Sequence, residues 1–148
     1  MSHLHLHIGA EHTSLAAQQE RGSMTIGWQT VLAGKQPVLP SPAALELAIM
    51  QVEDAISASW PQRLTLNTVS SSDPAIYQIA TLSGLAAAHG SQLGRHSVEN
   101  LFSLLANAVE GGSAAGLPHT PNFVGSLLIL RELMHHLDIA SITLQSGS

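Results

Sequence analysis

The sequence predicts a small α/β or α+β protein: a single-domain layer sandwich with about four helices on a three- to four-stranded sheet. Its 148 residues are enough for one domain with one core. Four segments combine a helix-start signal with apolar residues three or four positions apart. Short segments of alternating apolar and polar residues lie between them and favour strands. The alternative is a mostly helical bundle with a small hairpin.

Two helices are predicted in the first part of the chain. Residues 41–59 begin with Ser-Pro, where the hydroxyl caps the helix and proline fits the first helical position. Residues 73–90 begin with Asp-Pro, which repeats this pattern, and end at a histidine and a glycine. Gly84 lies inside that segment, so both one helix and two shorter helices stay open.

Two further helices are predicted in the second part. In the segment 97–110, Ser97 is the expected cap and two glycines follow the last apolar residue. In the segment 120–138, Thr120 precedes a proline at the first helical position. The apolar stripe of this last helix is wide, which predicts burial on more than one side.

Four segments are predicted strands because they alternate or are rich in β-favouring residues: 3–8, 24–32, 63–69 and 140–145. The segment 3–8, His-Leu-His-Leu-His-Ile, alternates without interruption. The segment 24–32 contains Gly27, which weakens that prediction.

The alternation places His3, His5 and His7 on one face of the first strand. Neutral imidazoles on one face can bind zinc, nickel or copper. Two other interpretations stay open: histidines tolerated on a half-exposed edge strand, or a foreign arm used for metal-affinity capture. Since residues 22–24 (Gly-Ser-Met) resemble a cloning scar, we divide the chain into a His-rich N-terminal strand or arm, 1–23, and a single α/β domain, 24–148.

A second candidate metal site lies in the last predicted helix. Glu132 is three positions before His135 and four before His136, so both pairs share a helical face. One Glu-x-x-His pair resembles half of the ligand set of di-iron carboxylate bundles, which use two copies. A solvated polar face at the helix end explains the same residues without a metal.

The sequence contains none of the usual catalytic motifs. We find no G-x-S-x-G, H-E-x-x-H, G-x-x-x-x-G-K-[ST] or G-x-G-x-x-G. The nearest approach to a phosphate cradle is "HIGAEHTS", residues 7–14, where a glycine, Thr13 and Ser14 follow a strand without the usual lysine. A plain turn explains the same stretch.

Composition excludes several classes of protein. Only 5 Lys and Arg stand against 10 Asp and Glu, and they are scattered, so neither nucleic acid nor an anionic membrane is an expected partner. Without cysteine, disulfides and thiolate metal sites are excluded. We see no signal peptide and no membrane-length apolar run, and expect a cytoplasmic protein.

Charged residues make up 10% of the chain, well below the roughly 25% of ordinary domains, which suggests a buried subunit interface. We therefore predict a non-catalytic assembly or accessory protein that acts through apolar interfaces, with itself or another protein subunit as partner. The alternative is a small histidine-based metal-binding protein or metalloenzyme with a divalent metal such as zinc or nickel. A small-ligand binding module stays open.

Overall fold

The computed structural model describes residues 3–16, 21–32, 39–60, 68–112, 116–118 and 120–146. They form four helices and six strands, which confirms the α/β class; the sheet is larger than predicted, and the mostly helical alternative is wrong. None of the described helices has the length and apolar character needed to cross a membrane. The elements, in chain order, are β1 (His3–Ile8), β2 (Thr13–Ala16), β3 (Arg21–Met24), α1 (Pro42–Ser59), β4 (Thr68–Ser71), α2 (Pro74–Leu82), β5 (Gln92–Gly94), α3 (Arg95–Val109), α4 (Pro121–His136) and β6 (Ser141–Leu144).

The sheet is mixed and has the strand order β3-β2-β1-β4-β6-β5. The first three strands form an antiparallel meander, whereas β1, β4 and β6 run parallel to one another. Strand β5 closes the other edge antiparallel to β6. The strand of alternating histidines is therefore an inner strand, not an edge strand. The sheet combines strands of the predicted N-terminal arm, 1–23, with strands of the predicted domain, 24–148.

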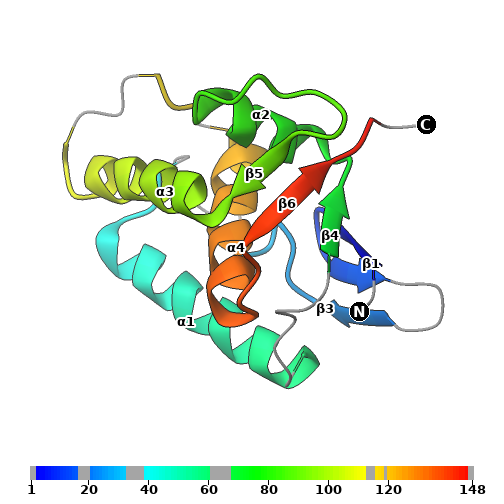
Figure 1. The fold of residues 1–148 in the computed structure, drawn as a ribbon. Coiled ribbons are helices and arrows are strands. Elements are labelled where there is room, and N and C mark those ends of the chain that lie inside the picture. The colour runs from blue at the N-terminus through cyan, green and yellow to red at the C-terminus, as the bar shows by residue number, and fades with distance from the viewer. Residues whose placement is uncertain are drawn as a thin grey trace.

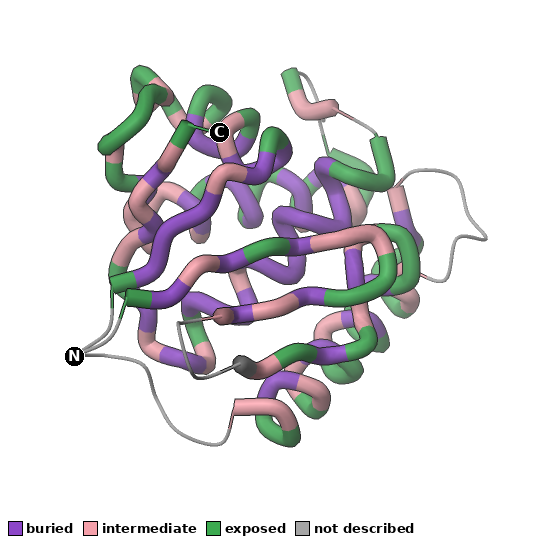
Figure 2. Tube along the Cα trace, turned by 90° about the vertical axis from the view of Figure 1, so that its right-hand side faces the viewer, coloured by how far each residue is buried: buried purple, intermediate pink, exposed green. Residues whose placement is uncertain are grey.

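The helices lie on one side of the sheet (Figure 1). Figure 2, turned by 90° so that the sheet faces the viewer, shows the strands in front of the helices, with buried and exposed residues alternating along them. In β1 the aliphatic residues Leu4, Leu6 and Ile8 are buried in the core, and the histidines point to the other face. The predicted alternation of β1 is confirmed.

Helix α4 is the centre of the helical layer and packs against α1, α2 and α3. Eleven of its residues are buried, because it is enclosed on several sides, as its wide apolar stripe predicted. Its predicted start is confirmed as well: Thr120 is the N-cap and its hydroxyl accepts a hydrogen bond from the Phe123 amide at 3.2 Å.

Three predicted elements differ in the structure, and a fourth lies mostly outside the described residues. Residues 24–32 do not form a strand: β3 ends at Met24 and a turn follows. Helix α2 ends at Leu82, two residues before Gly84, which has a φ of +95°. Helix α3 is capped by Gly94 rather than Ser97. Of the predicted strand 63–69, only 68 and 69 lie within the described residues, in β4.

Candidate functional site

A cleft of about 220 Å³ lies where β1 and β4 end. The two strands are parallel neighbours, so their carboxyl ends meet at one edge of the sheet. In open α/β sheets, ligands bind at this edge, beyond the carboxyl ends of the strands. The residues that line the cleft are His7, Ile8, Gly9, Ala10, Trp28, Asp73, Pro74, Ala75 and Asn122.

Among the described residues of the cleft, His7 and Asp73 are a pair of titratable side chains in direct contact. His7 Nδ1 lies 2.7 Å from Asp73 Oδ1. An ionised carboxylate can only accept, so Nδ1 is the donor and Nε2 is left able to accept a proton. The His7 side chain is 61% exposed, whereas that of Asp73 is 10% exposed. The imidazole therefore faces solvent while its orienting carboxylate is nearly enclosed.

Asp73 is the N-cap residue of α2, as the sequence predicted, but its carboxylate does not cap the helix. It points to the end of β1 instead. There, Oδ2 accepts a hydrogen bond from the Ile8 amide at 2.7 Å, in addition to the contact between Oδ1 and His7. One carboxylate thus links the ends of β1 and β4 and fixes the orientation of the imidazole. This second role of Asp73 has no signal in the sequence, because a cap before proline already explains it.

The walls of the cleft are held by backbone contacts between two turns. The Trp28 amide donates to the Gly9 carbonyl and the Gln29 amide to the Ala10 carbonyl, both at 2.9 Å. Gly27 is required at this crossing, because a Cβ there would overlap the backbone of Gly9 and Ala10. The turn after β1 is therefore fixed against the turn after β3. This packing explains why residues 24–32 leave the sheet.

Two helix N-termini contribute to the cleft. Pro74 and Ala75 are the first residues of α2, and Asn122 is the second residue of α4. Helix N-termini carry partial positive charge and amide groups without intrahelical partners, which favours anions. The cleft thus offers an imidazole–carboxylate pair for proton transfer beside two helix ends that favour a negatively charged group.

The structure uses only part of the predicted phosphate cradle 7–14. Gly9 lines the cleft, but His12 is exposed outside the lining. Thr13 is fully buried in β2, and its hydroxyl donates to the Ile26 carbonyl at 2.8 Å. Thr13 therefore stabilises the meander.

The other two histidines of β1 contact β4 on the open face of the sheet. His3 Nε2 lies 3.0 Å from Ser70 Oγ, and His5 Nδ1 lies 3.4 Å from the same oxygen. His3 Nδ1 also lies 3.1 Å from Thr68 Oγ1. These contacts occupy ring nitrogens of both histidines with hydroxyl groups of the neighbouring strand.

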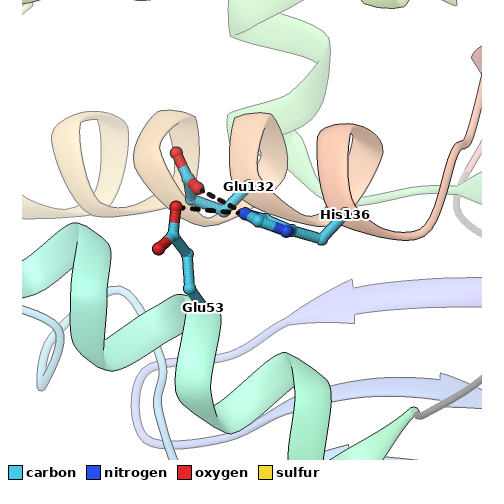
Figure 3. A group of neighbouring side chains, drawn as sticks. All are labelled: Glu53, Glu132 and His136. Carbon is cyan, nitrogen blue, oxygen red and sulfur yellow. Dashed lines mark hydrogen bonds and ion pairs between the residues drawn. The ribbon is translucent and has the colours of Figure 1, made fainter.

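A second cluster of titratable side chains joins α1 to α4. Glu53, Glu132 and His136 each offer one ligand atom, and these atoms all lie within 4.8 Å of one another. His136 Nε2 is 3.1 Å from Glu53 Oε2 and 3.3 Å from Glu132 Oε1 (Figure 3). In the described part of the chain this is the one group of three or more such residues that is close enough to share a metal ion.

Glu132 is the unusual member of this cluster because its side chain is fully buried. Its Oε2 accepts a hydrogen bond from Arg131 at 2.6 Å, and Arg131 also donates to Glu99 at 2.8 Å. Oε1 has no hydrogen-bond partner among the described residues. Burial raises the pKa of Glu132, and the hydrogen bond from Arg131 opposes this only in part. An enclosed carboxylate oxygen therefore faces the cluster without a hydrogen bond, and His136 Nε2 lies 3.3 Å from it.

The structure separates the other predicted metal ligands. His135 is exposed, and its ring meets that of His136 edge-on, with the centroids 5.0 Å apart. Helix α4 lies on the helical side of the sheet (Figure 1). His3, His5 and His7 alternate with the buried residues of β1 and therefore face the other side. The strand histidines and those of α4 are therefore not brought together. Glu53, which completes the cluster, was missed because it lies 79 positions before Glu132 on another helix.

The fold is shared with several solved structures, although no protein-family model and no curated protein matches the sequence. The Aquifex aeolicus PPX-GPPA enzyme superposes with a TM-score of 0.74 at 11% identity, over 100% of this chain and 54% of its own. An exopolyphosphatase-like protein gives 0.72 at 15% identity, over 99% and 55%. The exopolyphosphatase from Cytophaga hutchinsonii gives 0.58 at 14% identity, over 99% and 54%.

The chain spans about half the length of these solved structures. At such low identity, the likeness establishes a shared fold. That fold is the one of Ppx/GppA phosphatase enzymes. Our prediction of a non-catalytic assembly or accessory protein that acts through protein–protein interaction is therefore wrong. The physical reason for the error is that low charge and wide apolar helices are explained by the enclosure of α4 within the chain itself.

Proposed function

We propose that this chain is a phosphatase domain that binds a phosphoryl group in the cleft and hydrolyses a phosphoanhydride bond there. The observation that carries the proposal is the His7–Asp73 pair, which lies beside two helix N-termini at the carboxyl ends of β1 and β4. The names of the solved structures with this fold support the same chemistry, since they include exopolyphosphatases. Inorganic polyphosphate is accordingly the first substrate to test.

The proposed reaction uses His7 as the general base and then as the general acid. The Asp73 carboxylate accepts a hydrogen bond from the Nδ1–H group of His7, which leaves Nε2 to take a proton from a water molecule as the water oxygen attacks phosphorus. The bond from phosphorus to the leaving phosphate oxygen breaks, and the imidazolium returns the proton to that oxygen. The N-termini of α2 and α4 stabilise negative charge on the phosphoryl group.

The test is release of orthophosphate from polyphosphate by the purified chain. Replacing His7 with glutamine removes the base, and we expect the rate to fall by about 10²- to 10⁴-fold, the usual contribution of general acid–base catalysis. His3→Gln is the matched control, because it changes an exposed histidine on the same face of the same strand, outside the cleft. Equal rates in the two variants would disprove the role of His7.

Binding is a second readout that does not require turnover. Because the solved structures are about twice as long as this chain, a longer polypeptide can supply groups for the reaction that this chain lacks. Titration with tripolyphosphate, followed by the NMR signals of the His7 ring and the Ala75 amide, reports on the cleft alone.

Two predictions from the sequence stay predictions: association with itself or another protein subunit, and a cytoplasmic location. The proposal for the cleft does not include zinc or nickel.

A further inference from the structure

The cluster of Glu53, Glu132 and His136 lies far from the cleft. Asn122, at the start of α4, lines the cleft, whereas His136 is the last residue of the same helix. At 1.5 Å per residue, the fourteen positions between them correspond to about 20 Å. The cluster therefore has no contact with the groups to which we assign the hydrolysis, and it needs its own explanation.

We propose that Glu53, Glu132 and His136 bind one zinc ion, which joins α1 to α4. Carboxylate oxygens and a neutral imidazole nitrogen are established zinc ligands. Two ligands of a tetrahedral zinc ion, each about 2.0–2.1 Å from the metal, lie about 3.3 Å from each other. The distances from His136 Nε2 to the two carboxylate oxygens, 3.1 Å and 3.3 Å, agree with this spacing.

The Oε1 oxygen of Glu132 gives a second observation in favour of a bound cation. Its side chain is completely enclosed, and Oε1 makes no hydrogen bond to the described residues, although His136 Nε2 lies 3.3 Å away. A buried carboxylate oxygen without a hydrogen bond is costly, and a metal ion would remove that cost. Arg131 holds the other oxygen at 2.6 Å and so leaves Oε1 directed at the ion.

The charges around the cluster also favour a divalent ion. Glu53 and Glu132 contribute two negative charges, and Arg131 is shared between Glu132 and Glu99. With a neutral His136, these five side chains carry a net charge of −2, which one zinc ion neutralises. The imidazole makes calcium or magnesium a poorer fit, since both prefer oxygen ligands.

The site is accessible from solvent and leaves one coordination position for water. The side chains of Glu53 and His136 are 39% and 31% exposed, so an ion can enter between α1 and α4. Three protein ligands leave the fourth tetrahedral position open. The ion would stabilise the folded chain by tying a helix of the first half to the central helix α4.

The test is titration of the full chain with zinc chloride after treatment with EDTA, followed by isothermal calorimetry. We expect one zinc ion per chain. Glu132→Gln and His136→Gln should each weaken binding by at least about 10- to 100-fold, since the loss of a residue that only supports a ligand already costs that much. His135→Gln and His5→Gln are the controls: the first changes the adjacent exposed histidine, the second a histidine of the open sheet face. Both should bind as wild type does.

Thermal unfolding gives a second readout of the same site. Zinc at 100 times its dissociation constant should raise the melting temperature of the wild-type chain by several degrees, and this rise should disappear in the two cluster variants. If Glu132→Gln fails to fold, the more exposed His136→Gln decides the outcome. The proposal is overturned if wild type binds no zinc, if both cluster variants keep wild-type affinity, or if His5→Gln alone removes the site.

Discussion

His7 Nδ1 lies 2.7 Å from Asp73 Oδ1, although the two residues are 66 positions apart in the chain. The contact exists because β1 and β4 are parallel neighbours and end at the same edge of the sheet. Asp73 also binds the Ile8 amide, so the pair is fixed to the backbone of β1. The proposed chemistry of the cleft depends on this arrangement, which predicts how each residue responds to substitution.

Asp73→Asn should strongly reduce the rate of polyphosphate hydrolysis and should lower the free energy of unfolding only slightly. Asparagine keeps one oxygen that can accept from the Ile8 amide, but it removes the negative charge that orients the His7 imidazole. We expect activity to fall by about 10²-fold or more while unfolding by urea shows a loss of about 1 kcal/mol. An Asp73→Asn protein that hydrolyses polyphosphate at the wild-type rate would contradict the orienting role.

Asp73→Ala should be clearly less stable than Asp73→Asn. Alanine leaves the Ile8 amide without its acceptor near the core, which costs about 1–3 kcal/mol. Loss of helix capping does not contribute, because the Asp73 carboxylate makes no capping hydrogen bond in α2. Urea unfolding of both variants measures the difference; equal stability would show that the hydrogen bond to Ile8 contributes little.

Gly125→Ala should destabilise the protein through a clash in the wall of the cleft. A Cβ at Gly125 on α4 would overlap the Trp28 backbone, which is itself bonded to Gly9. Overpacking of this kind costs about 1–3 kcal/mol. The comparison variant is Gly94→Ala, where nothing lies within 4 Å of the added atom and φ is −79°, so that it loses only the preference of the α3 N-cap for glycine over alanine. Thermal melts of the two variants that coincide would contradict the tight packing of α4 against this turn.

Glu132→Gln should change how stability depends on pH in the absence of metal. Burial raises the pKa of Glu132 above the ordinary value of 4.5, so the folded protein keeps this proton to a higher pH than the unfolded chain does. Its contribution to stability is therefore full below pH 4.5 and is lost as the pH rises through the raised pKa. The stability of Glu132→Gln relative to wild type should accordingly increase over that range.

Urea unfolding in EDTA at a series of pH values measures this dependence. Glu46→Gln is the control, because it removes the same charge from an exposed position on α1. A difference between Glu132→Gln and wild type that does not vary with pH, or that decreases as the pH rises, would show that burial does not govern this carboxyl group.

The sequence predicted the elements whose signals are local. The helix starts at Ser41 and Thr120 depend on a hydroxyl and a following proline, and both hydroxyls accept the expected backbone hydrogen bond. The alternation of β1 predicted which side chains enter the core. Strands β2 and β5 have only four and three residues, too few for a periodic pattern to be distinguished from a loop.

The sites could be predicted only in part, because each is assembled from distant segments. Four of the six predicted metal ligands lie outside the cluster, and its third member, Glu53, is brought to α4 by helix packing alone. His7 was noticed as one of three equivalent histidines, and only the position of β4 beside β1 distinguishes it, by placing Asp73 next to it. Pairing between strands decides such contacts, and it has no local signal.

The most direct test of the central claim compares orthophosphate release from polyphosphate by wild type, His7→Gln and His3→Gln under identical conditions. The account predicts measurable release by wild type and His3→Gln, and a loss of about 10²- to 10⁴-fold in His7→Gln. Release that is unchanged in His7→Gln, together with unchanged NMR signals of the cleft on addition of tripolyphosphate, would contradict it.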